Sequence, residues 1–399
     1  MVKDKNVTVV LGMGPTGLGV VRSLGHNGVS VLGLDFDTGL SGLKSKYCKA
    51  MLCPHPINEQ AKLFKLMVKV GSTLNKKGVL YPTSDEFVKF VSVYREGLEK
   101  LFLVAIPDRD LVETFLNKND TYIIANNNGI PLPQTLMPQS TVEIANIANK
   151  IDYPVFIKPC LTYEWKIAKF DTKGFIANNP QQLIKLMREI FKKKVKVIIQ
   201  SIIQGPVEDL YEVCCYCGIN ETSSIGFVKR KLRQFPNDFG LGSYMESVRH
   251  DDLLRKSLNF LNEIGFKGPA EIEFKKDERD GQFKLIEVNV RLTLQNSLAE
   301  ACGINFPLIQ YCDLIGEETD FFNGYKEGIK WVWGEIDFQA FLELKKKKQL
   351  GFLEWIQSIY YADEYAIFSW NDLGPFFKSI NYGLDILKIP FSMLRKLLA

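Results

Sequence analysis

The sequence lacks the features that mark several large protein classes. Its 399 residues contain no run of 18 or more apolar side chains, so we expect no membrane-spanning helix. The N-terminal residues 1–12 enter a strand-like pattern at once and show no signal-peptide pattern. Net charge is only +4, from 50 basic and 46 acidic residues, so no global field attracts nucleic acid. We therefore expect an intracellular, cytoplasmic protein that binds no nucleic acid.

Cysteine and histidine do not occur in patterns that would support the chemistry they usually perform. Eight cysteines in a chain of this length do not make a disulfide framework. Cys214 and Cys217 have C-x-x-C spacing, but there is no second pair and no nearby histidine, which favours buried, reduced thiols over zinc. The three histidines, His26, His55 and His250, fall where surface or capping residues are typical. No Ser/His/Asp or Cys/His constellation is present, so covalent catalysis by a side chain is not expected.

Length and patterning predict a globular protein with two or three domains. Hydrophobic residues make up 46% and charged residues 24%, which is ordinary for a globular chain that can bury a substantial core. From 7 to 107, short strands alternate with helices, which indicates an open, parallel α/β sheet. From 153 to 300, longer strands are mostly joined as hairpins, which indicates a separate α+β domain. A Pro- and Gly-rich stretch at 115–135 predicts the junction between them.

The first strand is followed by a glycine turn with two interpretations. Residues 12–17, GMGPTG, match G-x-G-x-x-G between a strand and a helix, and Asp35 ends the second strand. This is the context of a dinucleotide fingerprint, in which the acid holds a ribose hydroxyl. An NAD-dependent oxidoreductase is therefore one alternative. The other is the tight joint of any open α/β domain, which we favour because the second domain offers no convincing partner for hydride transfer.

The segment 268–296 carries the most informative pattern. It reads as two strands joined by a polar turn at Asp277–Gly281, with side chains alternating between the two faces. Strict alternation along the second strand places Leu285 on the face of Glu287, opposite Val288. A solvated hairpin with incidental acids is the simpler alternative.

Such a hairpin would bring Glu273 close to Glu287 and Asn289. Two carboxylates that share a site either raise one pKa or need a cation. Oxygen ligands of this kind suit Mg²⁺, which keeps its other positions for water and phosphate oxygens. Arg291 adds a planar donor for a phosphate or a carboxylate. The hairpin therefore predicts a metal site beside an anion.

Other strands carry groups suited to a nucleotide. Lys158 ends a strand directly before a proline and supplies a point charge for a phosphate. The stretch Ile199–Ile203 leads into a Gly-Pro turn, can present backbone groups to an adenine edge, and is followed by Glu208 and Asp209 for ribose. A third strand places three cations on one face: Lys229, Lys231 and Arg233. If this face lies toward the acidic hairpin, a polyanion and its metal would bind between the cations and the acids.

The order of these features resembles the ATP-grasp superfamily over roughly residues 1–320. Lys118 ahead of the segment 129–133, GIPLP, is similar to the first lysine of the family, and Lys158 is similar to the second. The hinge strand at Gln200–Gly205 and an acid strand followed by E-x-N-x-R complete the match. The sequence of residues 229–248 and 271–291 resembles that of carbamoyl-phosphate-synthase-like proteins, which belong to the carboxylate–amine ligases.

The resemblance implies an ATP site and a role for each matching residue. The cations would contact the phosphates, the hinge residues would line the adenine, and one acid would hold ribose. These groups are Lys118 and Lys158 for the phosphates, Gln200, Ser201 and Ile203 for adenine, and Glu208 for ribose, while Lys231 and Arg233 would also bind the cofactor.

The resemblance also implies the metal ligands and the reaction. Glu273, Glu287 and Asn289 would ligate one or two Mg²⁺ ions, with Mn²⁺ as an alternative. Arg291 and Lys231 would be catalytic and would steady the transferred phosphoryl group. The reaction would be activation of a small carboxylate or amino acid by the γ-phosphate of ATP, followed by amine attack on the acyl phosphate.

The sequence departs from the family in the loop after the second lysine, which is often rich in glycine. Here Gly174 is the only glycine in 160–174, so backbone cradling of the γ-phosphate is in doubt, and Lys166, Lys169 or Lys173 can substitute as donors. A nucleotide-binding protein without turnover is therefore a further alternative.

The resemblance divides the chain into four parts. A Rossmann-like domain would span 1–115, two ATP-grasp subdomains 116–195 and 196–320, and a C-terminal extension with an amphipathic helix 321–399. We expect that helix to dock on its own domain or on a partner, with peripheral membrane contact the less favoured reading. The partners would be small-molecule carboxylates and amines, with a homodimer as an option. Residues 84–86 would either face the cleft and read the substrate or cap a helix.

Overall fold

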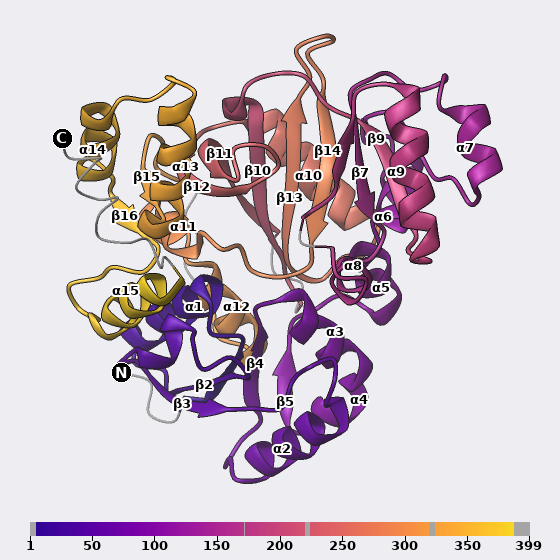
Figure 1. The fold of residues 1–399 in the computed structure, drawn as a ribbon. Coiled ribbons are helices and arrows are strands. Elements are labelled where there is room, and N and C mark those ends of the chain that lie inside the picture. The colour runs from indigo at the N-terminus through magenta and orange to yellow at the C-terminus, as the bar shows by residue number, and fades with distance from the viewer. Residues whose placement is uncertain (1–4, 171, 220–223, 319–323, 387–399) are drawn as a thin grey trace.

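The computed structural model describes residues 5–170, 172–219, 224–318 and 324–386. Within these residues the strands form sheets of five, seven and four strands, with helices packed around them (Figure 1). The predicted combination of an open α/β sheet with an ATP-grasp-like α+β region and a C-terminal helical part is confirmed. In the described ranges, no helix is both long enough and apolar enough to cross a membrane.

The first sheet is parallel, with strand order β3-β2-β1-β4-β5. Its central strands are buried along their whole length, because helices cover both faces of an open parallel sheet. The strands are β1 (Thr8–Leu11), β2 (Val31–Asp35), β3 (Cys48–Leu52), β4 (Gly78–Pro82) and β5 (Phe102–Val104). The helices are α1 (Pro15–His26), η1 (Ser41–Lys44), α2 (Gln60–Ser72), α3 (Asp85–Val93) and α4 (Arg95–Leu98).

The glycine turn between β1 and α1 is packed against its own chain. Gly12 has φ +98°, and a Cβ at Gly17 would lie 1.9 Å from the Gly12 carbonyl oxygen. The carboxylate of Asp35 accepts a hydrogen bond from the Met13 N–H at 2.6 Å. The Met13 carbonyl in turn accepts from the Gly42 N–H at 3.1 Å. Two of the glycines and the acid are thus accounted for by close packing of the turn.

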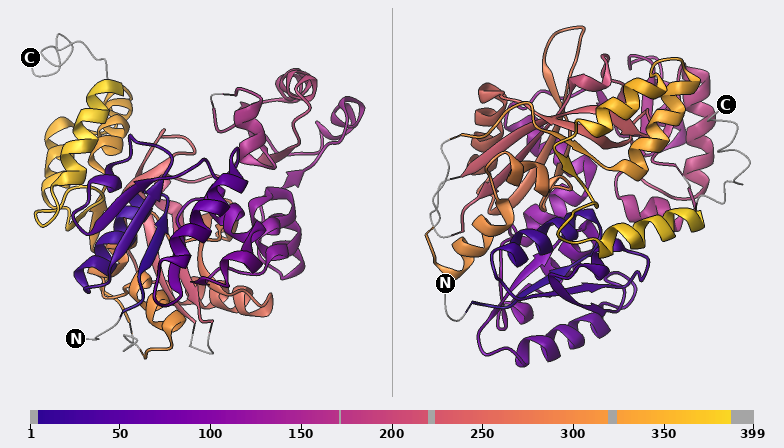
Figure 2. Two further views of the ribbon diagram at one scale, coloured as in Figure 1. Left: turned by 90° about the horizontal axis from the view of Figure 1, so that it is seen from below. Right: turned by 90° about the vertical axis from the view of Figure 1, so that its left-hand side faces the viewer.

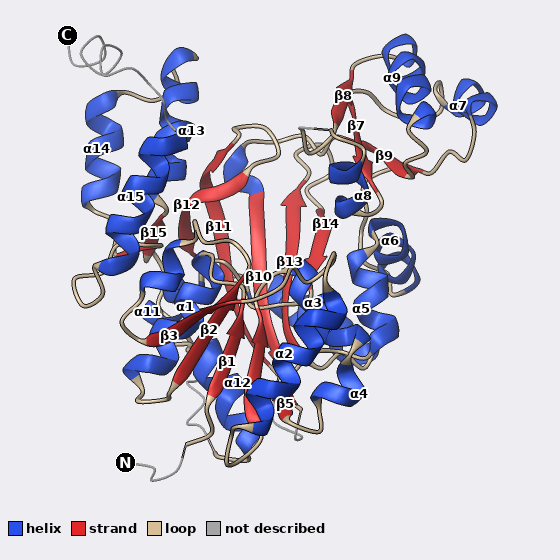
Figure 3. Cartoon of the chain, turned by 60° about the horizontal axis from the view of Figure 1, so that its bottom comes forward, coloured by secondary structure: helices blue, strands red, loops and turns tan. Residues whose placement is uncertain are grey.

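The second sheet has four strands in the order β6-β9-β7-β8. Figure 3 shows it on one side of the large sheet, with α13 and α14 on the other, and in Figure 2 its magenta helices stand away from the indigo N-terminal part. The strands are β6 (Thr135–Leu136), β7 (Val155–Pro159), β8 (Phe175–Ala177) and β9 (Val197–Ser201). The helices before and around it are α5 (Arg109–Leu116), α6 (Lys118–Asn127), α7 (Thr141–Ile147), α8 (Thr162–Ile167) and α9 (Pro180–Lys192).

The third sheet has seven strands in the order β14-β13-β10-β11-β12-β15-β16. Its first five strands are joined in antiparallel pairs, as the hairpin pattern predicted. The strands are β10 (Leu210–Cys217), β11 (Ile225–Phe235), β12 (Leu241–Ser247), β13 (Gly268–Lys276), β14 (Phe283–Asn289), β15 (Lys330–Val332) and β16 (Glu364–Tyr365). The helices η2 (Val207–Asp209), α10 (Asp251–Glu263), α11 (Asn296–Ala301) and α12 (Phe306–Ile315) accompany it.

A β-bulge in the acidic hairpin corrects one prediction. Glu273 pairs with Glu287, but Phe274 pairs with Leu285, so Ile286 is an extra residue on β14. The bulge reverses the alternation at that point. Leu285 is fully buried in the same core cluster as Val288, and not on the face of Glu287 as strict alternation predicted.

The C-terminal part supplies helices α13 (Gly334–Lys346), α14 (Phe352–Tyr360) and α15 (Gly374–Ile386). It is tied back to the first domain, because Asp372 accepts hydrogen bonds from Arg22 Nε at 3.0 Å and from Ser45 Oγ at 2.7 Å. Residues 387–399 lie outside the described residues, so the predicted tail helix is seen only as far as Ile386.

Candidate functional site

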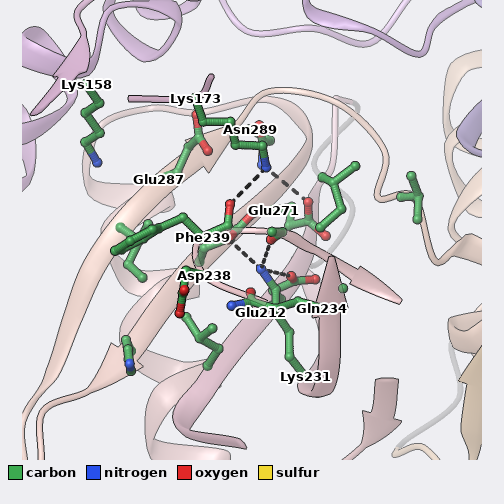
Figure 4. A pocket seen from close by; sticks show the side chains of 18 of the residues that line it. Lys158, Lys173, Glu212, Lys231, Gln234, Asp238, Phe239, Glu271, Glu287 and Asn289 are labelled. Atoms are coloured by element: carbon green, nitrogen blue, oxygen red, sulfur yellow. Dashed lines mark hydrogen bonds and ion pairs between the residues drawn. The ribbon is translucent and has the colours of Figure 1, made fainter. Parts of the chain in front are cut away.

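A cleft of about 1820 Å³ lies where the three sheets meet. One wall comes from β7 and the hinge after β9, and another from β10, β11, β13 and β14. The end of β4 and the start of α3 line a third side of the cleft, and residues of α13 and α14 line a fourth. Figure 4 shows Lys158, Lys173, Glu287 and Asn289 in the upper part of this pocket, and Glu212 and Lys231 in its lower part.

The residues that the sequence predicted to form the site come together in this cleft. Every one of them lines it, although they come from seven different elements and the loops between them. They are Lys118, Lys158, Gln200, Ser201, Ile203, Glu208, Lys231, Arg233, Glu273, Glu287, Asn289 and Arg291.

Carboxylates form a ladder across neighbouring strands of the large sheet. The register places Glu287 opposite Glu273, and Glu273 opposite Glu212 on β10. Asn289 lies opposite Glu271 and donates a hydrogen bond to it at 3.3 Å. The predicted proximity of Glu273, Glu287 and Asn289 is thus present in the backbone register itself.

Two lysines lie against this ladder from different directions. Lys118 Nζ, at the first position of α6, is 2.5 Å from Glu287 Oε1. Lys231 Nζ is 3.3 Å from carboxylate oxygens of both Glu273 and Glu212. Burial alone would raise the pKa of Glu287, but the Lys118 ammonium beside it lowers that pKa to about 2. Glu287 is therefore ionised throughout the ordinary pH range.

Glu273 is in the opposite electrostatic position. Its pKa is raised, chiefly by burial, and the carboxylates of Glu212 and Glu287 add to this against the attraction of Lys231. A buried group that several negative neighbours disfavour as an anion is the arrangement that a nearby divalent cation relieves.

The donor set fits Mg²⁺. Glu273 and Glu287 offer carboxylate oxygens, Asn289 adds an amide, and the open cleft beside them leaves positions for water and phosphate oxygens. Among the described residues, no group of three or more His, Cys, Asp and Glu side chains could enclose a metal ion. The ladder is therefore suited to an ion shared with a phosphate, and its exact ligand set stays a prediction.

Lys158 is buried beside α6, the helix that carries Lys118. Its ammonium donates to the hydroxyl of Tyr122 at 2.9 Å, and that hydroxyl donates to the Ile286 carbonyl at 2.5 Å. Burial, followed by the charge of Lys118, lowers the pKa of Lys158 to about 7. A phosphate bound beside these two neighbouring lysines would stabilise both of their positive charges.

The predicted adenine residues form the hinge between the two sheets. Gln200 and Ser201 end β9, and Ile203 follows in the loop; all three are buried against the cleft. Gln200 Nε2 donates to Thr135 Oγ1 at 3.1 Å, which fixes the edge of the strand. Glu208 lies on η2 directly beyond the hinge. Their roles toward a nucleotide stay predictions.

The cation strand β11 is only partly open to a ligand. Lys229 is fully buried, and its ammonium binds the carboxylates of Glu212 and Glu271 directly, so no ion lies between them. Arg233 makes a bidentate pair with the buried Asp337 of α13, with distances of 2.9 and 2.8 Å. Of the three cations predicted to share a face, only Lys231 approaches both a metal-ligand candidate and the open cleft.

Arg291 joins the acidic hairpin to the first sheet. Its Nε donates to Asp85 Oδ1 at 2.8 Å, and its Nη2 donates to Asn289 Oδ1 at 3.3 Å. Ser84 caps α3 by accepting from the Phe87 N–H, and it also lines the cleft. Residues 84–86 thus include a helix cap and line the cleft, and their role in reading a substrate stays a prediction.

Sequence reasoning missed four residues that shape the cleft. Tyr122 lies four residues after Lys118, on the same face of α6, and this spacing could have revealed it. Glu212 is an acid within the otherwise apolar strand LYEVCCYC, which is a second usable signal. Ile286 is the extra residue of the bulge, and Phe156 lies two residues before Lys158 on the same face of β7, so alternation along that strand could have revealed it.

Comparisons with known proteins agree with this geometry. Residues 243–316 match the family described as "Carbamoyl-phosphate synthase L chain, ATP binding domain". The 2-oxoglutarate carboxylase biotin carboxylase domain of Hydrogenobacter thermophilus, solved as a dimer with magnesium ADP and bicarbonate, superposes with a TM-score of 0.64. The two sequences are 16% identical, and the superposition covers 81% of this chain and 74% of the chain of that domain. The chain has the ATP-grasp fold.

Two further similar proteins are ligases by name. The D-aspartate ligase of Enterococcus faecium is 23% identical over 300 residues, which are 72% of this chain and 71% of that protein. An L-amino acid ligase from Bacillus licheniformis has a TM-score of 0.59 and 15% identity over 79% of this chain and 75% of its own. These matches confirm the predicted resemblance to ATP-grasp carboxylate–amine ligases.

The match to carbamoyl phosphate synthase is shorter. The N-terminal section of that enzyme's large chain from Methanopyrus kandleri is 23% identical over 208 residues, which are 49% of this chain and 33% of the relative. The chain thus spans about a third of that relative.

Proposed function

We propose that this ATP-grasp chain is an ATP-dependent ligase that joins a small carboxylate or amino acid to an amine through an acyl phosphate. The observation that carries the proposal is the convergence of Lys118, Lys158 and the Glu273–Glu287 pair on one cleft. Lysines suited to phosphates and carboxylates suited to a divalent cation line one space, which is large enough for a nucleotide and two small substrates.

Each side chain has a task that follows from its position. Lys158 and Lys118 offset the charge of the phosphates, and Lys231 holds Glu273 in place beside them. When bound, Mg²⁺ would be held by Glu273, Glu287 and Asn289 and would neutralise phosphate charge. Arg291, at the junction with the first sheet, is placed to hold carboxylate or acyl-phosphate oxygens. A loop that closes over the cleft would keep water from the activated acyl group.

The division of the chain follows the same scheme. We propose that residues 1–115 help bind the carboxylate through the end of β4, where Asp85 meets Arg291. Residues 116–195 and 196–320 would hold the nucleotide between their sheets. Residues 321–399 would complete the wall formed by α13 and α14.

An amino acid is the first substrate class to test. The D-aspartate ligase relative supports it by name, and the Asp85–Arg291 pair offers one group for an ammonium and one for a carboxylate. A homodimer and a cytoplasmic location, both expected from the sequence, can be tested by light scattering and by fractionation. Contact of the C-terminal helix with a membrane stays the less favoured expectation.

The test is ADP release with Mg²⁺ over a panel of amino acids, other small carboxylates and amines, with mass spectrometry of any condensed product. Glu287→Gln should abolish Mg²⁺-dependent ADP release, because it removes a metal ligand and the partner of Lys118. Glu278→Gln, at the exposed turn of the same hairpin, is the matched control and should keep native turnover. Full turnover by the Glu287 variant would contradict the metal assignment.

A nucleotide-binding protein without turnover is the second candidate. The glycine-poor loop after Lys158 favours it, since Gly174 is the only glycine in 160–174. It predicts tight binding of magnesium ATP but no ADP release with any substrate pair. The panel above separates the two candidates.

A further inference from the structure

A short loop crosses the cleft from the large sheet to the four-stranded sheet. Residues 236–240 connect β11 to β12, and the ring of Phe239 stacks on the ring of Phe156 in β7. The ring centroids are 4.2 Å apart and the planes differ by 14°. Both rings line the cleft, and Phe156 lies two residues before Lys158 on the same face of its strand.

A polar contact reinforces this bridge beside the reacting end of the cleft. Lys173, after the second family lysine, donates to the Phe239 carbonyl at 3.1 Å. The neighbouring Gly240 carbonyl accepts from Lys231 Nζ at 3.5 Å, and Lys231 also contacts Glu273. Figure 4 labels Phe239 and Asp238 among the side chains that line the pocket.

The base of the loop is anchored while its tip is strained. Gln234 Nε2 donates to the Asn237 carbonyl at 2.7 Å, and the Asn237 N–H donates to Glu343 of α13 at 3.0 Å. Phe239 itself has φ +59°, in the left-handed region that non-glycine residues seldom adopt. A fixed base and a strained tip are typical of a segment held by its contacts rather than by its own backbone preference.

We propose that residues 236–240 form a latch that closes the nucleotide cleft by stacking Phe239 on Phe156. The latch takes over part of the covering role for which the 160–174 segment has too few glycines. It must open for a nucleotide to enter or leave, and it shuts equally over the empty and the filled cleft. The inference rests on the proposed function only for the identity of the ligand, magnesium ATP.

The test is the kinetics of binding of a fluorescent ATP analogue with Mg²⁺ to the full chain by stopped flow. If opening of the latch limits entry and exit of the nucleotide, Phe239→Ala should raise the association and dissociation rate constants together, by about five- to tenfold. A change of this size corresponds to the free energy that one aromatic stack contributes. The dissociation constant should stay nearly unchanged. Phe239→Tyr keeps the ring and should keep native rates.

Two controls make the result specific. In a Phe156→Ala background, Phe239→Ala should change neither rate constant further, because the stack is already lost. Phe64→Ala removes a stacked pair with Tyr94, centroids 4.8 Å apart, outside the cleft and should leave both rates unchanged. Thermal unfolding of each variant verifies that it is folded.

Other outcomes overturn the latch. Faster association with tighter binding would mean that Phe239 occupies the nucleotide site, and faster dissociation alone would mean that it contacts the base. Unchanged rates would mean that the stack has no gating role. If the native chain binds the analogue but Phe239→Ala changes nothing, only the latch fails. If the latch kinetics appear without ligase turnover, only the proposed function fails.

Discussion

Lys158 and Tyr122 form a buried pair, with the ammonium nitrogen 2.9 Å from the phenol oxygen. Among the described residues, no carboxylate lies within ion-pair distance of Lys158, while Glu287 is paired with Lys118. The pKa of Lys158 is therefore about 7, with burial as the main cause and the charge of Lys118 next. The cleft therefore contains a lysine whose pKa lies near neutrality.

The affinity for magnesium ADP should depend on pH through Lys158. Its ammonium is present below pH 7 and is lost as the pH rises through that value, whereas phosphate binding favours the charged form. Affinity should therefore fall between pH 7 and 9, approaching a limit of about tenfold per pH unit. Isothermal titration across this range measures it.

Lys158→Arg is the control for this effect. An arginine stays charged at every pH in the range, so the variant should bind with a flat pH profile even if its affinity is lower. A flat profile in the native chain, or the same slope in the variant, would contradict the assignment. Since the unfolded chain binds the proton more tightly, Lys158 should also make folding stability rise between pH 7 and about 10, on the ordinary lysine value.

Asp337 should be critical for stability rather than for nucleotide contact. It is fully buried, holds Arg233 with two hydrogen bonds, and also accepts from Trp355 Nε1 at 2.9 Å. Asp337→Ala leaves a buried guanidinium unpaired, which costs roughly 3–5 kcal/mol of the free energy of unfolding. Chemical denaturation measures this loss.

The matched control is an exposed ion pair of the same kind. Asp252 pairs with Arg255 on the surface of α10, at 2.7 Å. Asp252→Ala should change the free energy of unfolding by about 1 kcal/mol or less, because exposed pairs contribute little. Equal losses in the two variants would mean that the Arg233–Asp337 pair does not hold α13 against the sheet.

The glycine turn gives a prediction that separates packing from dinucleotide binding. Gly17→Ala should destabilise the first domain strongly, since its Cβ would lie 1.9 Å from the Gly12 carbonyl. Gly14→Ala should be tolerated, because nothing lies within 4 Å of a Cβ built there. A dinucleotide site would need both glycines and would give a thermal shift with NAD(H). We expect no such shift, and a clear one would revive the oxidoreductase interpretation.

Much of the candidate site could be predicted because the signals are local. The period of two along 268–276 and 283–289 brings Glu273 opposite Glu287 once the turn at Asp277–Gly281 is recognised. Lys158 at a strand end and the Gly-Pro turn after the hinge are equally local. The alternation of strands and helices likewise predicts the parallel first sheet, because each βαβ unit is contiguous in the sequence.

The remaining features depend on contacts between distant segments. The bulge at Ile286, which buries Leu285, adds one residue to a ladder and leaves no mark on the alternation pattern. Arg233 looks like a phosphate ligand in its strand, but Asp337, over a hundred residues later, takes its guanidinium. A sequence pattern assigns a side chain to a face, but not the group that meets it there.

By itself, then, the sequence determined the strand and helix order, the Glu273–Glu287 pair and the lysines beside it, because period and turn chemistry act over a few residues. Only the tertiary structure decided which cations stay open to a ligand, that Lys158 loses much of its basicity, and that Phe239 meets Phe156 across the cleft. These depend on burial and on packing between sheets, which no local pattern encodes.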